Sequence, residues 1–492
     1  MRFSILFSFC LFWIPESHGK HSLNLIHNHI RKYVNFSVDP CEDFYLHACP
    51  ASSRKSFLAR LDDIKDASVA KHKPRQPFYQ RFTQKMLLET NEVLIKLNST
   101  PRGMYYADIA SITLDGFEDL NKDQKDALLV RIGKGSVHYN VYKKHLNSAF
   151  DGNIASKLFH RLEVKAKKMF ATIKAAIRKS IGKTPWTKTY NSTNMFQKTL
   201  DDINFYTFSD AREAVEIWIQ KYNEVYDECL GILTGTYGNQ TGSAFCDVLA
   251  IHKSRRVLDE VNIKVLPYIR DDVISDKATL FNINENIVYI SNSILLLFSS
   301  DFSSDLYGSI GFSLLHEIFH SLVFGADDRY QNHPLIPYWT KNSECVVEQV
   351  RKTCETFSTI RGPNWEEQGC DPHKTFEEDA ADIAAYRIAW DLYRKSFSRK
   401  TMVPNSESLN KEQLFFYGAS TILCFPNAMK VRKNDGNVHS NTYQRVNTLM
   451  SQMPAFSRAF SCNPTDKMVL NKASHCVLYG PNAPMTRKNS DN

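Results

Sequence analysis

Two histidines and a glutamate in the middle of the chain have the types and spacing of a metal site. His316 and His320 are four residues apart, and Glu317 follows the first of them. On a helix, residues at this spacing project from one face, so both imidazoles can bind one metal ion. Zinc in such a site activates a water and polarises a substrate carbonyl, and Glu317 is the candidate general base. The pattern predicts metal-assisted hydrolysis. For the bare motif, a helix with two hydrogen-bonded histidines is an equally good interpretation.

A catalytic zinc also needs a third protein ligand, and the segment 376–382 offers two acids for that role. Glu378 and Asp382 lie one helical turn apart. One acid can bind the metal while the other orients a ligand histidine and fixes its tautomer. Taken alone, this segment is better explained as an exposed acidic helix start, because Asp and Glu favour the first turn of a helix.

Together these segments resemble the neprilysin and endothelin-converting enzyme family of zinc metallopeptidases. The family's GHExxHGFD segment is similar to residues 315–323, and its ENxAD segment is similar to residues 378–382. The resemblance implies one zinc ion per chain with three protein ligands: His316, His320 and Glu378. It also implies that Glu317 is the general base and that Asp382 supports the metal site from behind the ligands.

Further likenesses extend toward both ends of the chain. The segments that resemble the family are 39–45 with Cys49, 338–349, 413–416, and 438–440 with Arg445. By this resemblance His439 donates a hydrogen bond to the developing oxyanion. Arg445 is expected to bind substrate carbonyls or a carboxylate through its guanidinium. The likeness is strongest from about 280 to 476, fair at 39–49 and weak between these segments.

Three departures from the family pattern bear on activity. The family has an Asn that holds the substrate backbone, and Ala278 takes its place in the segment 278–281. Loss of that bond predicts binding weaker by about 1–3 kcal/mol where the partner group is left buried. Val323 stands where the family has Asp, and the region 51–255 is shorter, which predicts a more open cleft. Because the expected ligands and base are all present, we expect an active peptidase with altered specificity.

The cysteines indicate an oxidising compartment. The chain has eleven, of which Cys10 lies in the first nineteen residues, and the remaining even number predicts disulfides. No CxxC pair occurs, so zinc bound by cysteines is not expected. The family resemblance implies these pairings: Cys41–Cys462, Cys49–Cys424 and Cys345–Cys476. The local pairings Cys229–Cys246 and Cys354–Cys370 are a guess that the sequence leaves open.

The N-terminus has the features of a signal peptide. Arg2 precedes the apolar segment 3–14, and small residues lie near a predicted cleavage site at Gly19. Twelve apolar residues fall short of the about 20 that span a bilayer, although an uncleaved anchor is the alternative. Acceptor sequons at four positions are consistent with a secreted glycoprotein: Asn35, Asn98, Asn191 and Asn239. We therefore expect an extracellular protein with no membrane span after cleavage.

Composition and apolar periodicity predict the elements that position the site. The 492 residues suggest two or three domains, and no basic run interleaved with aromatics points to nucleic acid. Amphipathic helices are expected through 51–255, the clearest at 159–181 with Gly182 as its stop. Strands are predicted within 281–297, and helices at about 306–324 and 376–395.

The predicted fold is mainly α with a small β-sheet, in two lobes, the catalytic lobe being thermolysin-like by the family resemblance. The expected divisions are a signal peptide (1–19), an N-terminal segment packed on the catalytic lobe (20–50), a shortened helical lid domain (51–255), the zinc peptidase domain (256–480) and a polar tail (481–492).

Two functions compete. The resemblance implies a secreted zinc metalloendopeptidase that cleaves peptides on the amino side of hydrophobic residues. The alternative is a secreted zinc-containing binding protein with little or no turnover, motivated by Ala278 and Val323. The peptide substrate and the oligomeric state cannot be read from the sequence.

Overall fold

A computed structural model describes residues 25–49, 55–72, 136–189, 191–233, 250–251, 254, 278–299, 304–324, 336–357, 371–396, 409–424, 439–470 and 476–484. Over these ranges the chain is mainly helical with a three-stranded sheet, which confirms the predicted fold class. The expected signal peptide at 1–19, most of the polar tail, and the sequons at Asn98 and Asn239 lie outside the described residues. No helix in the described part of the chain is both long enough and apolar enough to cross a membrane.

The described elements follow one another along the chain in this order. The helices of the first half are α1 (Leu25–Tyr33), α2 (Phe44–Ala48), α3 (Phe57–His72), α9 (Ser136–Ile181), α10 (Pro185–Thr189), α11 (Thr193–Asp201) and α12 (Phe208–Leu233). The helices of the second half are the 3-10 helix η3 (Ile294–Ser299), α15 (Ser304–Leu306), the π-helical turn η4 (Tyr307–Gly311), α16 (Phe312–Phe319), α17 (Ile336–Phe357), α18 (Phe376–Ser396), α19 (Lys411–Leu423), α20 (Thr442–Ser451) and α21 (Pro454–Phe460). The strands are β1 (Asn204–Tyr206), β2 (Thr279–Asn282) and β3 (Ile287–Ile290).

The sheet has the strand order β1-β3-β2, so β2 lies at an edge. β2 and β3 form an antiparallel hairpin, whereas β1 pairs with β3 in parallel. Asparagines shape the hairpin turn, because the Asn284 N–H donates to Asn282 Oδ1 at 3.1 Å and Asn286 adopts a left-handed φ of 50°. The prediction of strands in 281–297 is confirmed for its first part. Its second part forms the 3-10 helix η3 instead.

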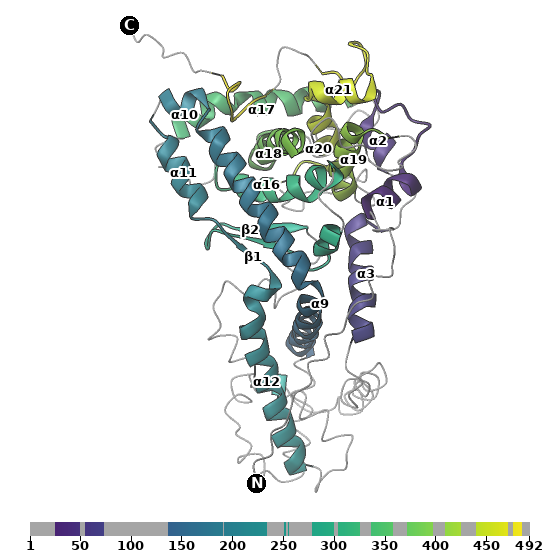
Figure 1. Cartoon of the computed structure of the whole chain (residues 1–492), viewed down its shortest axis with the longest axis vertical. Helices are drawn as coiled ribbons and strands as arrows, with labels where there is room; N and C mark the ends of the chain where they lie inside the picture. The colour runs from purple at the N-terminus through teal and green to yellow at the C-terminus, as the bar shows by residue number, and fades with distance from the viewer. Residues whose placement is uncertain are drawn as a thin grey trace, which may run out of the picture.

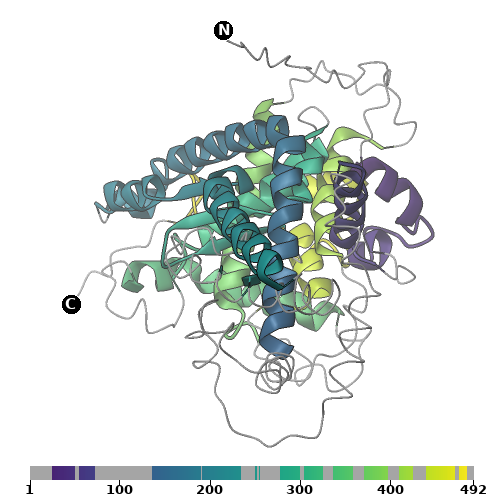
Figure 2. The same cartoon turned by 90° about the horizontal axis from the view of Figure 1, so that it is seen from below.

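The long helix α9 confirms the predicted helix at 159–181 and its end before Gly182. It crosses the molecule from α10 and α11 toward α12, which extends below the sheet (Figure 1). α12 packs along α9 (Figure 2), and Lys167 Nζ lies 2.9 Å from Asp210 Oδ1 between them. Two residues before Lys167 in the same helix, the Lys165 ammonium donates to the Phe298 carbonyl at 3.1 Å. α9 therefore connects α12 to the region that holds the candidate site.

One hydrophobic core includes residues from both halves of the chain. Trp186 of α10 is fully buried, and its indole N–H donates to the Leu478 carbonyl at 2.9 Å. Its ring centroid lies 6.4 Å from that of Trp339 in α17 and 5.6 Å from that of Tyr479. α10 and α11 thus pack directly on the elements that follow the sheet. α16, α18, α19 and α20 lie together above that sheet (Figure 1).

The helix predicted at 306–324 is interrupted and ends early. It consists of α15, the π-helical turn η4 and α16, which ends at Phe319. Beyond it, side chains from distant segments bind the backbone carbonyls. The Tyr479 hydroxyl donates to the Leu322 carbonyl, and the Trp339 indole N–H donates to the Phe324 carbonyl at 2.6 Å. These tertiary contacts fix a turn where apolar periodicity alone would continue the helix.

Two glycines allow η4 and α15 to approach α19 closely. A Cβ on Gly308 would overlap the Phe415 carbonyl, and one on Gly418 would overlap the Asp305 carbonyl. Both clashes involve backbone atoms, which cannot move aside as a side-chain end would. The start of the helix that carries His316 and His320 therefore depends on glycine at these positions.

We expect Gly308→Ala to destabilise the protein by about 1–3 kcal/mol, because one helix must shift to admit the methyl group. Thermal unfolding should show a clear fall in Tm. Gly311→Ala is the matched control, since its Cβ would meet nothing closer than the Leu306 carbonyl oxygen at 3.4 Å. Equal Tm values for the two variants would contradict the close packing of η4 on α19.

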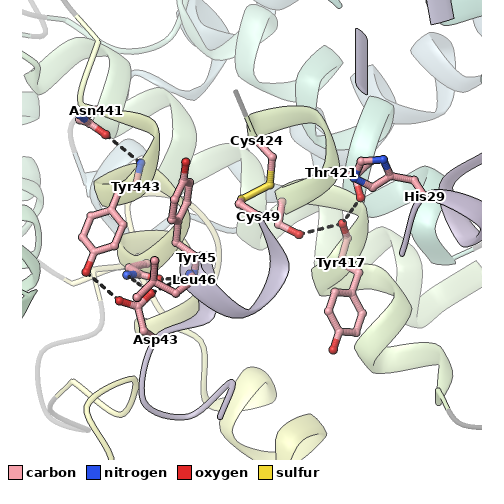
Figure 3. The surroundings of a disulfide bond; sticks show 12 residues. His29, Asp43, Tyr45, Leu46, Cys49, Tyr417, Thr421, Cys424, Asn441 and Tyr443 are labelled. Carbon is pink, nitrogen blue, oxygen red and sulfur yellow. Dashed lines mark hydrogen bonds between the residues drawn. A yellow bond between two sulfur atoms is a disulfide. The ribbon is translucent and has the colours of Figure 1, made fainter. Parts of the chain in front are cut away.

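Among the described residues, two disulfides tie the N-terminal segment to the C-terminal half, and a third joins two segments within that half. Cys41–Cys462, Cys49–Cys424 and Cys345–Cys476 are all present, which confirms the pairings implied by the family resemblance. Near the Cys49–Cys424 disulfide, hydrogen bonds also join the N-terminal segment to α20 (Figure 3). There the Tyr443 hydroxyl donates to Asp43 Oδ2 at 2.7 Å, and Asn447 donates to Asp43 Oδ1 at 3.1 Å. The pairings Cys229–Cys246 and Cys354–Cys370 each include a position outside the described residues.

Candidate metal centre

Two packed helices carry the candidate ligands. His316 and His320 lie at the end of α16, one helical turn apart, and Glu378 lies in the first turn of α18. The two imidazole Nε2 atoms are 3.0 Å apart. Glu378 Oε2 lies 3.1 Å from His316 Nε2 and 3.6 Å from His320 Nε2. Three ligand atoms from segments about sixty residues apart in sequence thus face one point.

The dimensions of this group suit a zinc ion. A tetrahedral zinc with bonds of about 2.0–2.1 Å holds its ligand atoms about 3.3–3.4 Å apart, and the three separations bracket that range. Glu378 Oε2 is buried and accepts no hydrogen bond from the described residues. A buried carboxylate oxygen without a donor is costly unless a cation binds it. The group therefore fits a metal ion in both geometry and chemistry.

Asp382 lies behind His316, as the family resemblance implies. Its Oδ1 is 2.7 Å from His316 Nδ1, and it receives two charge-assisted hydrogen bonds from Arg445, through Nε at 2.7 Å and Nη2 at 2.8 Å. Contact at Nδ1 orients the imidazole so that Nε2 faces His320 and Glu378. Burial alone would raise the pKa of Asp382, but the cationic groups of Arg445 and His316 hold it below its usual value.

The charge balance of the cluster also calls for a cation. Burial alone would lower the pKa of His316, yet the adjacent carboxylates of Asp382 and Glu378 raise it to about 10. His320 lacks an equally close carboxylate pair, so burial and the neighbouring His316 lower its pKa. Without a metal, the site thus takes up a proton at His316. A metal cation can supply that positive charge instead.

His439 approaches the same carboxylate from the loop before α20. Its Nε2 lies 3.2 Å from Glu378 Oε2, and its side chain is 40% exposed. Burial lowers the pKa of His439 to about 4, so the imidazole is neutral near pH 7. The next residue anchors this loop, because the Ser440 hydroxyl donates to Asp379 Oδ2 at 2.8 Å. His439 is therefore held at the rim of the group and remains partly open to solvent.

Glu317 is held by hydrogen bonds from the edge strand β2 rather than by the three candidate metal ligands. Its Oε1 accepts a hydrogen bond from the Thr279 hydroxyl at 3.0 Å. Its Oε2 accepts one from the Phe281 backbone N–H at 2.8 Å. The carboxylate thus lies between the helix that carries both histidines and strand β2. A group bound to that strand would lie beside Glu317.

The structure brings together all seven predicted site residues and adds three that the sequence analysis did not single out. The added residues are Thr279 and Ser313 beside Glu317, and Asp379 beneath the His439 loop. Asp379 could have been noticed, because it replaces the Asn of the family's ENxAD segment. Burial raises the pKa of its carboxyl to about 7. No sequence motif marked Thr279 as a site residue; only its place in the segment 278–281 did so.

The two substituted positions are both buried. Ala278 is 8% exposed and has no polar side chain to offer a substrate at the start of β2. Val323 is 1% exposed and belongs to the hydrophobic core. An apolar side chain at position 323 suits these hydrophobic surroundings.

Comparisons with known proteins agree with this site. Residues 280–476 match the profile of peptidase family M13. Neprilysin-1 of Caenorhabditis elegans is 27% identical over an alignment of 249 positions that covers 46% of this chain and 30% of that protein. The human Kell blood group glycoprotein is 33% identical over 109 residues, which are 21% of this chain and 14% of that protein. The chain thus spans less than a third of the curated relatives it matches.

A solved structure extends the fold similarity over most of the chain. A chain titled Haemonchus galactose containing glycoprotein complex superposes with a TM-score of 0.55 at 13% identity, covering 92% of this chain and 98% of that chain. This match concerns the fold alone. The profile match covers α16 and α18, the two helices that carry the candidate ligands. Residues 280–476 of this chain thus resemble peptidase family M13, and the similarity to neprilysin-1 agrees with the likeness to the neprilysin and endothelin-converting enzyme family of zinc metallopeptidases.

Proposed function

We propose that this protein is a secreted zinc-dependent endopeptidase that cleaves peptides on the amino side of hydrophobic residues. One observation carries the proposal. His316, His320 and Glu378 present three ligand atoms 3.0–3.6 Å apart, and the adjacent Glu317 reaches the edge strand. Hydrolysis of an extended peptide requires a metal site, a general base and a strand edge to which the peptide can bind, all close together.

The proposed metal ligands are His316, His320 and Glu378. A zinc ion held by them would polarise the substrate carbonyl and increase the acidity of the attacking water. Asp382 holds His316 in the tautomer whose Nε2 lone pair is available for the metal. Arg445 in turn fixes both oxygens of Asp382, so the ligand geometry is set before a substrate arrives.

Glu317 is the proposed general base. It accepts a proton from the water whose oxygen adds to the carbonyl carbon of the peptide bond. As the C–N bond breaks, that proton passes to the departing amine nitrogen, so the carboxylate is regenerated. Neighbouring His439 is neutral near pH 7, and its N–H is suited to donate to the oxygen that becomes negative during attack.

Arg445 contacts Asp382 in addition to the substrate role that the family resemblance implies. Its Nε and Nη2 atoms are both engaged with Asp382. Binding of a substrate carbonyl by the remaining Nη1 stays a proposal. Secretion is likewise proposed, supported by three disulfides that join distant parts of the chain and would persist in an oxidising compartment.

A binding protein with a zinc site and little turnover is the second candidate. Ala278 favours it, because the start of β2 lacks the side-chain amide that holds substrate in the family. A peptide could then still add to the edge of β2 through backbone hydrogen bonds but would be held less firmly in the orientation needed for attack.

The experiment that separates these functions is cleavage of a mixed peptide library by the purified protein. We expect cuts that fall before hydrophobic residues, stop with a zinc chelator and resume when zinc is returned. Cleavage that persists through chelation would overturn the zinc peptidase. Zinc-loaded protein that leaves every peptide intact would instead support the binding protein.

A further inference from the structure

We propose that Thr279 is a positioning residue that holds the carboxylate of Glu317 in its working orientation, with Ser313 supporting it. This inference rests on the proposed function, because it assigns Thr279 a role through the general base. It starts from three side chains. Ser313 and Glu317 are four residues apart on α16, and Thr279 of β2 contacts both of them.

The contacts form a continuous chain of hydrogen bonds. Thr279 Oγ1 lies 3.0 Å from Glu317 Oε1 and 2.6 Å from Ser313 Oγ. Thr279 is 3% exposed, so water does not compete freely for its hydroxyl. In a site of low polarity such bonds are stronger than at a surface, and leaving one unmade costs more.

The direction of each bond follows from the number of protons available. The Thr279 hydroxyl has a single proton and donates it to Glu317 Oε1 at 3.0 Å, which is closer than the alternative carbonyl acceptor, Ser313 O at 3.4 Å. Ser313 is then the donor to Thr279 Oγ1. Removing the Thr279 hydroxyl therefore deprives Glu317 of a donor and Ser313 of an acceptor at the same time.

Strand geometry explains why β2 reaches Glu317 at two points. The Ser291 N–H donates to the Ala278 carbonyl at 3.1 Å, so the backbone groups of Ala278 face β3. Because backbone direction alternates along an antiparallel strand, those of Thr279 and Phe281 face the open edge. The Phe281 N–H donates to Glu317 Oε2 from that edge, while the Thr279 hydroxyl binds Oε1.

Two contacts on two different oxygens fix the rotation of the carboxylate. One contact alone would leave it free to turn about its last bond, a torsion with a broad range of allowed angles. A base that is displaced by even about 1 Å can lose two orders of magnitude in rate. Thr279 thus supplies orientation, and in its absence the Phe281 N–H would still hold Oε2.

The test is the steady-state kinetics of Thr279→Val and Thr279→Ser on one good peptide. Val keeps the size and β preference of Thr but lacks the hydroxyl, so we expect kcat to fall by about 10- to 100-fold with little change in KM. Ser retains the hydroxyl and should restore most of the rate. Unchanged kcat in Thr279→Val, or equal losses in the Val and Ser variants, would overturn the positioning role.

Thr207→Val is the matched control. Thr207 is also buried and its hydroxyl donates to a carboxylate, Asp210 Oδ2 at 2.9 Å, at the start of α12. This change should lower Tm without selectively lowering kcat. A similar fall in kcat for Thr207→Val would show that loss of any such bond acts through general destabilisation, against our inference.

A thermal-unfolding cycle gives a readout that does not depend on activity. Thr279→Val, Glu317→Met and the double variant are compared, and the Tm shifts of the single variants should sum to more than the double shift. Additive shifts in a protein that cleaves peptides would overturn this inference alone. If the Tm shifts are non-additive but the wild-type protein cleaves no peptide, the contact between Thr279 and Glu317 stands. The proposed function would then be wrong, and the catalytic role of Thr279 with it.

Discussion

Glu317→Gln is expected to keep its zinc and lose about 100- to 10,000-fold in kcat, the range that a positioned general base contributes. The amide of Gln cannot accept the proton from the attacking water. Its carbonyl oxygen can still accept from the Phe281 N–H, and its NH2 group can donate to the Thr279 hydroxyl, so both contacts can be kept. The measurement is kcat on a good peptide, together with metal analysis of the same preparation.

Glu344→Gln is the matched control, since it makes the same chemical change at an exposed position on α17. It should leave both zinc content and kcat at the wild-type value. Substantial turnover in Glu317→Gln would assign the base to another residue. Loss of zinc in that variant would instead show that Glu317 belongs to the metal ligands.

Glu378→Ala is expected to lose the metal itself. The change removes one of three ligand atoms and leaves His316 and His320 facing an uncompensated gap. Structural and catalytic zinc sites depend on their full set of protein ligands, so zinc should dialyse away against a competing chelator that the wild type withstands. Activity should disappear with the metal.

Glu377→Ala is the control for Glu378→Ala, because it removes the neighbouring glutamate of the same helix start. It should retain one zinc per chain. Full zinc retention in Glu378→Ala would contradict the proposed ligand set. Asp382→Asn should fall between these variants, with metal affinity about 10- to 100-fold weaker, because Asp382 orients a ligand without binding the metal.

Local sequence patterns predicted the elements that carry the site because those elements are set by local rules. The acidic start and apolar spacing of 376–395 predicted α18 to within one residue of its observed end. Spacing of four put His316 and His320 on one face, and the geometry of any helix then brings their rings together. The three long-range disulfides followed from the family resemblance rather than from spacing.

The parts that could not be predicted depend on contacts between distant segments. The end of α16 at Phe319 depends on Trp339 and Tyr479 binding the following carbonyls. The three-residue strand β1 is defined by its parallel pairing with β3, more than eighty residues later in the chain. No periodic pattern marks a strand of that length.

The same limitation applies to the roles of individual site residues. Arg445 and Asp382 are 63 positions apart, and only the packing of α18 against α20 pairs them. The contact between Thr279 and Glu317 likewise needs β2 to lie against α16. Sequence reasoning therefore named candidate site residues but not the hydrogen bonds that orient them.

The most direct measurement is the anomalous scattering of crystals of the purified wild-type protein, collected on both sides of the zinc absorption edge. Our account predicts one strong zinc peak per chain, about 2.0–2.1 Å from the Nε2 atoms of His316 and His320 and from the Glu378 carboxylate. A zinc-free group whose three side chains bind only one another, or a zinc peak held by other residues, would contradict it.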